Sequence, residues 1–162
     1  MVRFALSVVL FCVILSASAE TLQGRVVGVA DGDTVTVLDA ALRTHKIRIG
    51  GIDAPEKRQA YGRVAHDYLA QAVFNKQVTV EFGKSDRYGR IVGKVWVDER
   101  DVGLDLIRTG LAWHYKKYER EQPFADRASY ARAERLAIDE RRGLWQEQHP
   151  TPPWDFRARP RS

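Results

Sequence analysis

Hydrophobic and polar positions alternate along much of the chain in the pattern of short β-strands. Five segments rich in Val, Ile and Thr predict strands at Gly24–Ala30, Thr34–Leu38, Thr44–Ile49, Lys76–Phe82 and Arg90–Val97. Residues 39–43 form a connection of hairpin length, so the second and third strands should pair antiparallel. A polar loop, residues 83–89, separates the last two.

Three segments show helical spacing instead. Apolar residues recur every three or four positions over Arg63–Phe74, which predicts an amphipathic helix after the third strand. Val102–Thr109 and Asp126–Glu140 predict two more helices, stopped by Gly110 and Gly143. Five strands with one helix inserted after the third is the order of an OB-fold. We therefore expect an α+β protein, a five-stranded OB-fold β-barrel with about three α-helices.

The first residues have the layout of a signal peptide. Arg3 precedes an apolar run, Phe4–Leu15, and then the small residues of Ser16–Ala19. The run is shorter than the ~20 residues that a membrane-spanning helix needs. The alternative is a retained membrane anchor, but Ala17 and Ala19 suit a signal peptidase. We expect cleavage after Ala19 and a secreted or periplasmic protein.

The rest of the chain divides into one domain and a short C-terminal segment. Residues 20–147 have the size and patterning of one domain. Residues 148–162 are rich in Pro, Trp and Arg, and the prolines of His149–Trp154 predict an extended arm, lying on the barrel or loose in solvent.

The net charge indicates the kind of partner, and the cysteine content excludes disulfides from the mature domain. The formal net charge of +5 falls to +4 when residues 1–19 are removed, because they hold one basic residue and no acid. The only cysteine, Cys12, is removed as well, so an ordinary core must hold the domain without disulfides. A basic protein favours polyanionic partners, although charge alone does not say which.

Acidic residues mark one rim of the predicted hairpin. Asp33 lies at the start of one strand and Asp53 just past the end of its partner, so the two carboxylates should meet. Oxygen ligands of this kind favour Ca²⁺ or Mg²⁺, bound weakly with a Kd on the order of 10⁻⁴–10⁻³ M. Ala54 precedes Pro55, which favours extended geometry and makes its carbonyl a candidate third ligand. Taken alone, Asp31-Gly32-Asp33 is better explained as an ordinary turn between strands.

An arginine on the third strand should emerge near the two acids, and a second arginine opens the last strand. Arg48 alternates with the core positions Ile47 and Ile49, so it points away from the core. Arg90 opens the last strand after the turn at residues 87–89. Each arginine alone would usually be a solvated strand residue, but a guanidinium pair suits an anionic phosphate.

Read together, these blocks resemble the staphylococcal nuclease family from about Gly24 to Trp145. The blocks are Asp31-Gly32-Asp33-Thr34, Ile47-Arg48-Ile49, Ile52-Asp53-Ala54-Pro55-Glu56 and Asp86-Arg87-Tyr88-Gly89-Arg90. The resemblance implies that Asp33, Asp53 and the Ala54 carbonyl hold one Ca²⁺ ion. It implies that Glu56 is the general base and that Arg48 and Arg90 bind the scissile phosphate. Hydrolysis of DNA and RNA would then leave 3′-phosphate ends.

The resemblance also implies nucleotide contacts and a simple assembly. Arg87 and Tyr88 correspond to positions that contact a terminal phosphate. Tyr115 or Tyr118 could stack on a base, although each could equally pack at the rim. We expect a monomer with no obligate protein partner. Two departures stand out: the loop after Glu56 is short, and an alanine stands at position 54 where the archetype has threonine.

Two other functions fit the same fold. An OB-fold of nuclease ancestry could bind nucleic acid or protein without cutting, but such domains typically lose site acids or arginines. This chain has all five of the key residues: Asp33, Arg48, Asp53, Glu56 and Arg90. A basic exported protein that adheres to anionic surfaces would require this set to be a coincidence. The four histidines share no metal-like spacing, which disfavours a zinc enzyme.

Overall fold

The computed structural model describes residues 20–159. The expected signal peptide, residues 1–19, lies outside this range, as do residues 160–162. Within the described range, every helix is too short or too polar to cross a bilayer.

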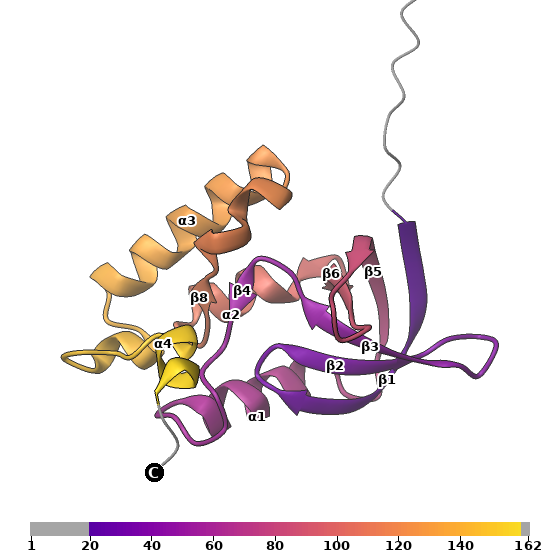
Figure 1. Ribbon diagram of the computed structural model, residues 1–162, viewed down its shortest axis with the longest axis horizontal. Coiled ribbons are helices and arrows are strands. Elements are labelled where there is room, and N and C mark those ends of the chain that lie inside the picture. The colour runs from indigo at the N-terminus through magenta and orange to yellow at the C-terminus, as the bar shows by residue number, and fades with distance from the viewer. Residues whose placement is uncertain (1–19, 160–162) are drawn as a thin grey trace, which may run out of the picture.

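Five strands close into a barrel (Figure 1). They are β1 (Glu20–Asp31), β2 (Thr34–Leu38), β3 (Thr44–Ile49), β5 (Gln77–Ser85) and β6 (Ile91–Val97). Antiparallel pairing runs in the order β3, β2, β1, β5, β6, and a parallel pairing of β3 with β6 completes the circle. The predicted five-stranded OB-fold barrel is confirmed, and β1 begins four residues earlier than predicted.

The apolar residues of the predicted alternating pattern fill the interior of the barrel. Val35 and Val37 on β2 and Ile47 and Ile49 on β3 are all fully buried or nearly so. Helix α1 (Gly62–Val73) covers one opening and buries the apolar side chains Ala65, Leu69 and Val73. These side chains belong to the same core cluster as Val35 and Ile47.

The two later predicted helices are present as α2 (Val102–Arg108) and α3 (Phe124–Asp139). Short 3₁₀ helices η1 (Lys116–Glu121) and η2 (Gly143–Gln146) flank α3. Gly110 and Gly143 have φ of 69° and 52°, and each backbone lies against the other so closely that a Cβ on either would meet carbonyl atoms. This contact ties the end of α2 to the end of α3.

The sequence did not predict three very short strands: β4 (Ile52–Asp53), β7 (Arg100–Asp101) and β8 (Trp113–His114). β4 pairs with β8, with Asp53 opposite Trp113. This pairing brings the segment after α2 next to the rim of the β2–β3 hairpin.

The C-terminal segment corrects one expectation. It is not an extended arm throughout, because Pro153–Ala158 form the helix α4. Pro153 occupies the first helical position, where a missing N–H costs nothing and the fixed φ favours the helix. Figure 1 shows α4 beside the loop that leads into α1, on the side of the molecule away from the start of β1.

Candidate active site

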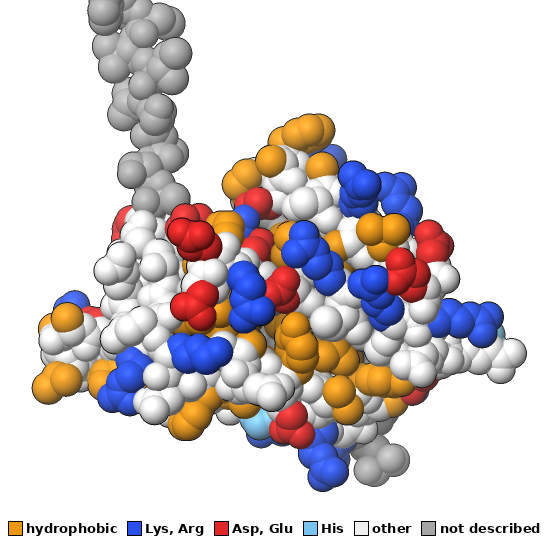
Figure 2. Space-filling view, turned by 180° about the vertical axis from the view of Figure 1, so that it is seen from behind, with side chains coloured by type: hydrophobic (Ala, Val, Ile, Leu, Met, Phe, Trp, Pro, Cys, Tyr) orange, Lys and Arg blue, Asp and Glu red, His pale blue; other side chains and the backbone are white. Residues whose placement is uncertain are grey.

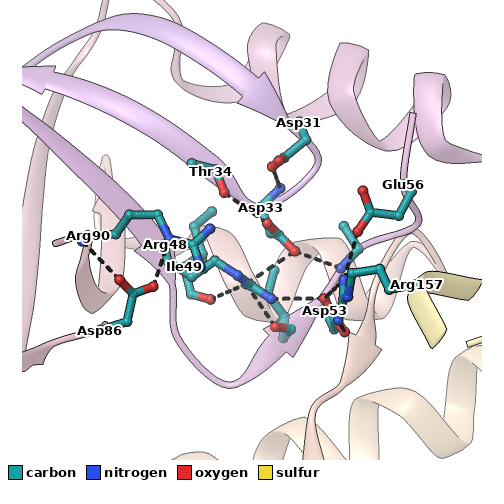
Figure 3. Close-up of polar contacts among 12 residues, drawn as sticks. Asp31, Asp33, Thr34, Arg48, Ile49, Asp53, Glu56, Asp86, Arg90 and Arg157 are labelled. Carbon is teal, nitrogen blue, oxygen red and sulfur yellow. Dashed lines mark hydrogen bonds and ion pairs between the residues drawn. The ribbon is translucent and has the colours of Figure 1, made fainter. Parts of the chain in front are cut away.

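The β2–β3 hairpin sets the geometry of the site. Thr34 pairs with Arg48, and the Asp33 carbonyl accepts a hydrogen bond from the Ile49 N–H at 2.8 Å. Asp33 therefore lies beside Arg48, and the chain returns through β4 to place Asp53 at the same rim (Figure 3). The structure thus brings together two carboxylates that are twenty positions apart in sequence.

Arg48 bridges the two carboxylates. Its Nη1 lies 3.1 Å from Asp33 Oδ2, and its Nη2 lies 2.9 Å from Asp53 Oδ1 (Figure 3). Nη1 also donates to the Ile49 and Ile52 carbonyls at 2.9 and 3.0 Å. The side chain is only 14% exposed, so these bonds form in surroundings of low dielectric constant. A fixed guanidinium thus neutralises much of the charge of the acid pair.

Asp33 is the most perturbed acid of the site. Its Oδ2 accepts the Ala54 N–H at 2.9 Å, and its Oδ1 accepts the Thr34 hydroxyl at 3.1 Å. Burial raises the pKa of Asp33 to about 7, with Asp31 and Asp53 adding to the rise and Arg48 opposing it. Asp31 also caps the turn by accepting the Asp33 N–H at 3.2 Å, so the turn interpretation holds for Asp31.

Glu56 lies on a tightly held loop. Its N–H donates to Gln59 Oε1 at 2.8 Å, and its carbonyl accepts the Gln59 N–H at 2.7 Å. A Cβ on Gly62 would lie 1.9 Å from the Glu56 carbonyl oxygen, so only glycine lets the loop pack against the start of α1. The short loop therefore holds the Glu56 backbone in place.

Arg157 on α4 is a site residue that the sequence analysis missed. Its Nη1 donates to Glu56 Oε1 at 2.7 Å, and its Nη2 donates to Asp53 Oδ2 at 2.7 Å (Figure 3). These contacts join residues about a hundred positions apart, so no local sequence pattern reveals them. The Pro-Pro pair before Trp154 was the one available signal, because proline often begins a helix.

Asp86 holds Arg90 in place directly before β6. Asp86 Oδ2 accepts from Arg90 Nε at 2.7 Å, and Oδ1 accepts the Arg90 and Tyr88 N–H groups. Partial burial opposes ionisation of Asp86, but these hydrogen bonds outweigh it and hold its pKa below the usual value. Because the side-chain bond uses Nε, the forked end of the guanidinium is not needed to hold Arg90 in place.

The predicted nucleotide contacts differ in their surroundings. Tyr88 is 68% exposed, and Arg87 lies over its ring and donates to its hydroxyl at 2.6 Å. Tyr115 stacks on Trp154 of α4, with ring centroids 5.3 Å apart and an interplanar angle of 21°. Tyr118 meets Tyr115 edge-on. Trp154, another residue that sequence reasoning missed, therefore covers one face of Tyr115.

One open groove of about 1420 Å³ joins these groups. All ten residues singled out from the sequence line it, namely Asp33, Arg48, Asp53, Ala54, Glu56, Arg87, Tyr88, Arg90, Tyr115 and Tyr118. Lys46, Lys84, Lys94, Lys117 and Arg157 add basic groups to its lining. On the face in Figure 2, basic and acidic side chains are interleaved without a continuous basic surface. The groove lining also holds as many acidic as basic side chains, so the case for a polyanionic ligand rests on the placement of particular arginines and not on net charge.

The donor set at the rim suits a hard divalent cation. In residues 20–159 no three His, Cys, Asp or Glu side chains form a ready metal cluster. A cation would instead use the Asp33 and Asp53 carboxylates, a backbone carbonyl such as that of Ala54, and water. Asp53 is fully buried and Asp33 nearly so. Burial, with the nearby acids, raises the pKa of Asp33, so a bound cation would stabilise its ionised form. Oxygen donors of this kind fit Ca²⁺.

Comparisons with known proteins identify the family of the chain. The family model for staphylococcal nuclease homologues matches residues 46–147. An "Uncharacterized endonuclease" of Escherichia coli is 39% identical over 158 residues, covering 97% of this chain and 99% of that protein. Protein ParB of Escherichia coli is 38% identical, covering 97% and 90% of the two chains. The staphylococcal-like nuclease CAN1 of Arabidopsis thaliana is 39% identical over 72% of this chain and 34% of its own length. The chain therefore belongs to the staphylococcal nuclease family of phosphodiester hydrolases.

Proposed function

We propose that this protein is an exported, calcium-dependent nuclease that hydrolyses phosphodiester bonds in DNA and RNA and leaves 3′-phosphate ends. The observation that carries the proposal is the convergence of Asp33, Asp53 and Glu56 with Arg48 and Arg90 along one groove of a family member. Each residue alone has an ordinary structural explanation. Their common placement in this fold is what favours catalysis.

The arginines have the chemistry that a phosphodiester requires. Its negative charge repels a nucleophile, and charge builds on its oxygens as the reaction proceeds. Arg48 and Arg90 would bind those oxygens with planar forks that stay charged at any working pH. Arg48 is fixed by two backbone carbonyls and Arg90 by Asp86, so both enter the reaction with little loss of side-chain freedom.

Glu56 would act as the general base. It would accept a proton from a water that attacks phosphorus in line, and the 5′ oxygen would leave. Its backbone is fixed by Gln59, and its side chain lies at the groove. The Asp33 and Asp53 carboxylates and the Ala54 carbonyl would hold calcium, which when bound supplies positive charge to the reacting phosphate.

Other residues that line the groove would contact parts of the nucleic acid away from the scissile bond. Arg87 and Tyr88 would contact a terminal phosphate, and Tyr115 and Tyr118 would pack against a base. Residues 20–147 would form the catalytic domain and residues 148–162 a C-terminal arm. The enzyme would work as a monomer without a protein partner, after residues 1–19 direct its export and are removed.

Digestion assays test the proposal directly. Single- and double-stranded DNA and RNA should be degraded with Ca²⁺ present, and a chelator should stop the reaction. End-labelled products should resist ligation until a phosphatase removes the 3′-phosphate. Binding of these polymers without cleavage, under all cation conditions, would instead identify a non-catalytic binding module.

The raised pKa of Asp33 predicts the pH dependence of stability in chelator. Its folded-state pKa is about 7 and the usual pKa of an aspartate is 3.8, so the folded protein holds an extra proton between these values. The stability from this group is therefore complete below about pH 4 and lost as the pH rises through 7. Between pH 5 and 8 the wild type should lose on the order of 1–3 kcal/mol of unfolding free energy from this group.

Asp33→Asn isolates that effect, because the amide is nearly isosteric and does not ionise. Urea denaturation in chelator should show a smaller loss of stability between pH 5 and 8 for the variant than for the wild type. Equal pH slopes in the two proteins would contradict the assignment of the titration to Asp33.

A further inference from the structure

Helix α4 occupies the rim of the groove with two side chains at once. Arg157 binds Asp53 and Glu56, and Trp154 stacks on Tyr115. This helix lies beyond residues 46–147, the part of the chain that the family model matches. We propose that α4 is a built-in competitor for the active site: Arg157 closes the cation site in the metal-free protein, and divalent-cation binding releases it. The inference rests on the proposed calcium site.

The carboxylate oxygens that a cation would need are already engaged. Asp33 Oδ2 accepts from the Ala54 N–H and lies 3.1 Å from Arg48 Nη1, while Asp53 Oδ1 accepts from Arg48 Nη2. Asp53 Oδ2 accepts from Arg157 Nη2 at 2.7 Å. Positive charge and N–H donors thus occupy the face of Asp53 that a metal ion would use. One arginine must give way before Asp53 can bind a cation through both oxygens.

Of the two arginines that bind Asp53, Arg157 is the one that can move away from the cation site. Arg48 is 14% exposed and is also bound to two backbone carbonyls, so moving it would leave buried acceptors unsatisfied. Arg157 is 44% exposed and lies in the last turn of a six-residue helix. Its guanidinium can be rehydrated without disturbing the barrel core. Arg157 is therefore the more exposed of the two arginines that bind Asp53, and less of its bonding is to buried groups.

The rest of α4 reinforces the closed state. The stack of Trp154 on Tyr115 covers an aromatic face at the groove, and Trp154 also meets Trp113 edge-on. Gln59 Nε2 donates to the Thr151 carbonyl at 3.0 Å, which fixes the start of the segment to the loop that carries Glu56. Release of the helical turn that carries Arg157 and Trp154 would therefore free Asp53, Glu56 and one face of Tyr115, while Thr151 keeps the segment attached.

A different role for Arg157 makes the opposite prediction. If Arg157 positions Glu56 or binds substrate phosphate, its loss should lower turnover and leave calcium affinity unchanged. If it competes with the cation, its loss should strengthen calcium binding. Affinity for the metal therefore separates the two roles, independently of activity.

Calorimetric titration with CaCl₂ tests the proposal on the wild type, Arg157→Gln and Arg159→Gln. Arg159 is a matched control because it lies directly after the same helix, has the same charge and contacts Thr151 rather than the acids. Arg157→Gln should bind Ca²⁺ about three- to tenfold more tightly than the wild type. Arg159→Gln should bind it with nearly the wild-type Kd. Equal or weaker binding by Arg157→Gln would overturn the proposal.

Tryptophan emission gives a second readout. Saturating Ca²⁺ should change the emission of the wild type as Trp154 leaves Tyr115, and Trp154→Phe should lose that change. Arg157→Gln without metal should already show much of it. A wild type that binds Ca²⁺ with no Trp154 signal would overturn the release step, whereas a wild type that binds no Ca²⁺ would overturn the proposed function itself.

Discussion

Replacing Glu56 with glutamine is expected to lower kcat by about 10²–10⁴-fold, the usual contribution of a general base. The amide keeps the shape of the side chain and can still accept the Arg157 hydrogen bond, so the fold and substrate binding should persist. Single-turnover cleavage of a labelled oligonucleotide at saturating Ca²⁺ measures the chemical step. Binding of the same oligonucleotide, measured separately, should change little.

Glu121→Gln is the matched control for that experiment. Glu121 also lines the groove, but it pairs with Lys84 away from the aspartate pair, so its loss should leave the chemical step close to that of the wild type. If Glu56→Gln retained near-wild-type turnover, Glu56 would not be the base.

Replacing Arg48 with glutamine should give the largest change in stability. Asp33 would then lose its guanidinium partner while Asp53 kept Arg157, and loss of one partner from a buried ion pair typically costs about 3–5 kcal/mol. Added Ca²⁺ should restore part of this loss, because the cation would replace the guanidinium between the acids. Urea denaturation at pH 8, with chelator and with excess Ca²⁺, measures both quantities.

Arg43→Gln serves as the control for Arg48→Gln. Arg43 pairs with Asp39 on the exposed β2–β3 turn, where a salt bridge is worth about 0–1 kcal/mol. Its loss should be small, and calcium should not alter it. A similar small effect for Arg48→Gln, or no recovery with Ca²⁺, would show that Arg48 does not neutralise a cation site.

The barrel and the acid pair could be predicted because local patterns determine them. Alternating residues such as Val35 and Val37 identify a strand by its period of two. The short hairpin then places Asp33 and Asp53 at one rim, since antiparallel pairing fixes the register. The placement of Arg48 beside both acids followed from the same alternation.

The contribution of α4 could not be predicted in this way. A Pro-Pro pair both ends helices and begins them, and a helix of six residues leaves no periodic signal. The Arg157 contacts with Asp53 and Glu56 depend on tertiary docking between chain segments about a hundred residues apart. The two-residue strands β4 and β8 were missed for a similar reason, and with them the route that brings Tyr115 to the rim.

We propose that one rim of the barrel binds a calcium ion and the scissile phosphate together. A crystal structure with Ca²⁺ and a phosphorothioate oligonucleotide would show whether it does. We expect one ion bound to Asp33 and Asp53, a phosphate between Arg48 and Arg90, and Glu56 facing the phosphorus through a water. An ion or phosphate bound elsewhere, with Asp33 and Asp53 still paired only to arginines, would contradict it.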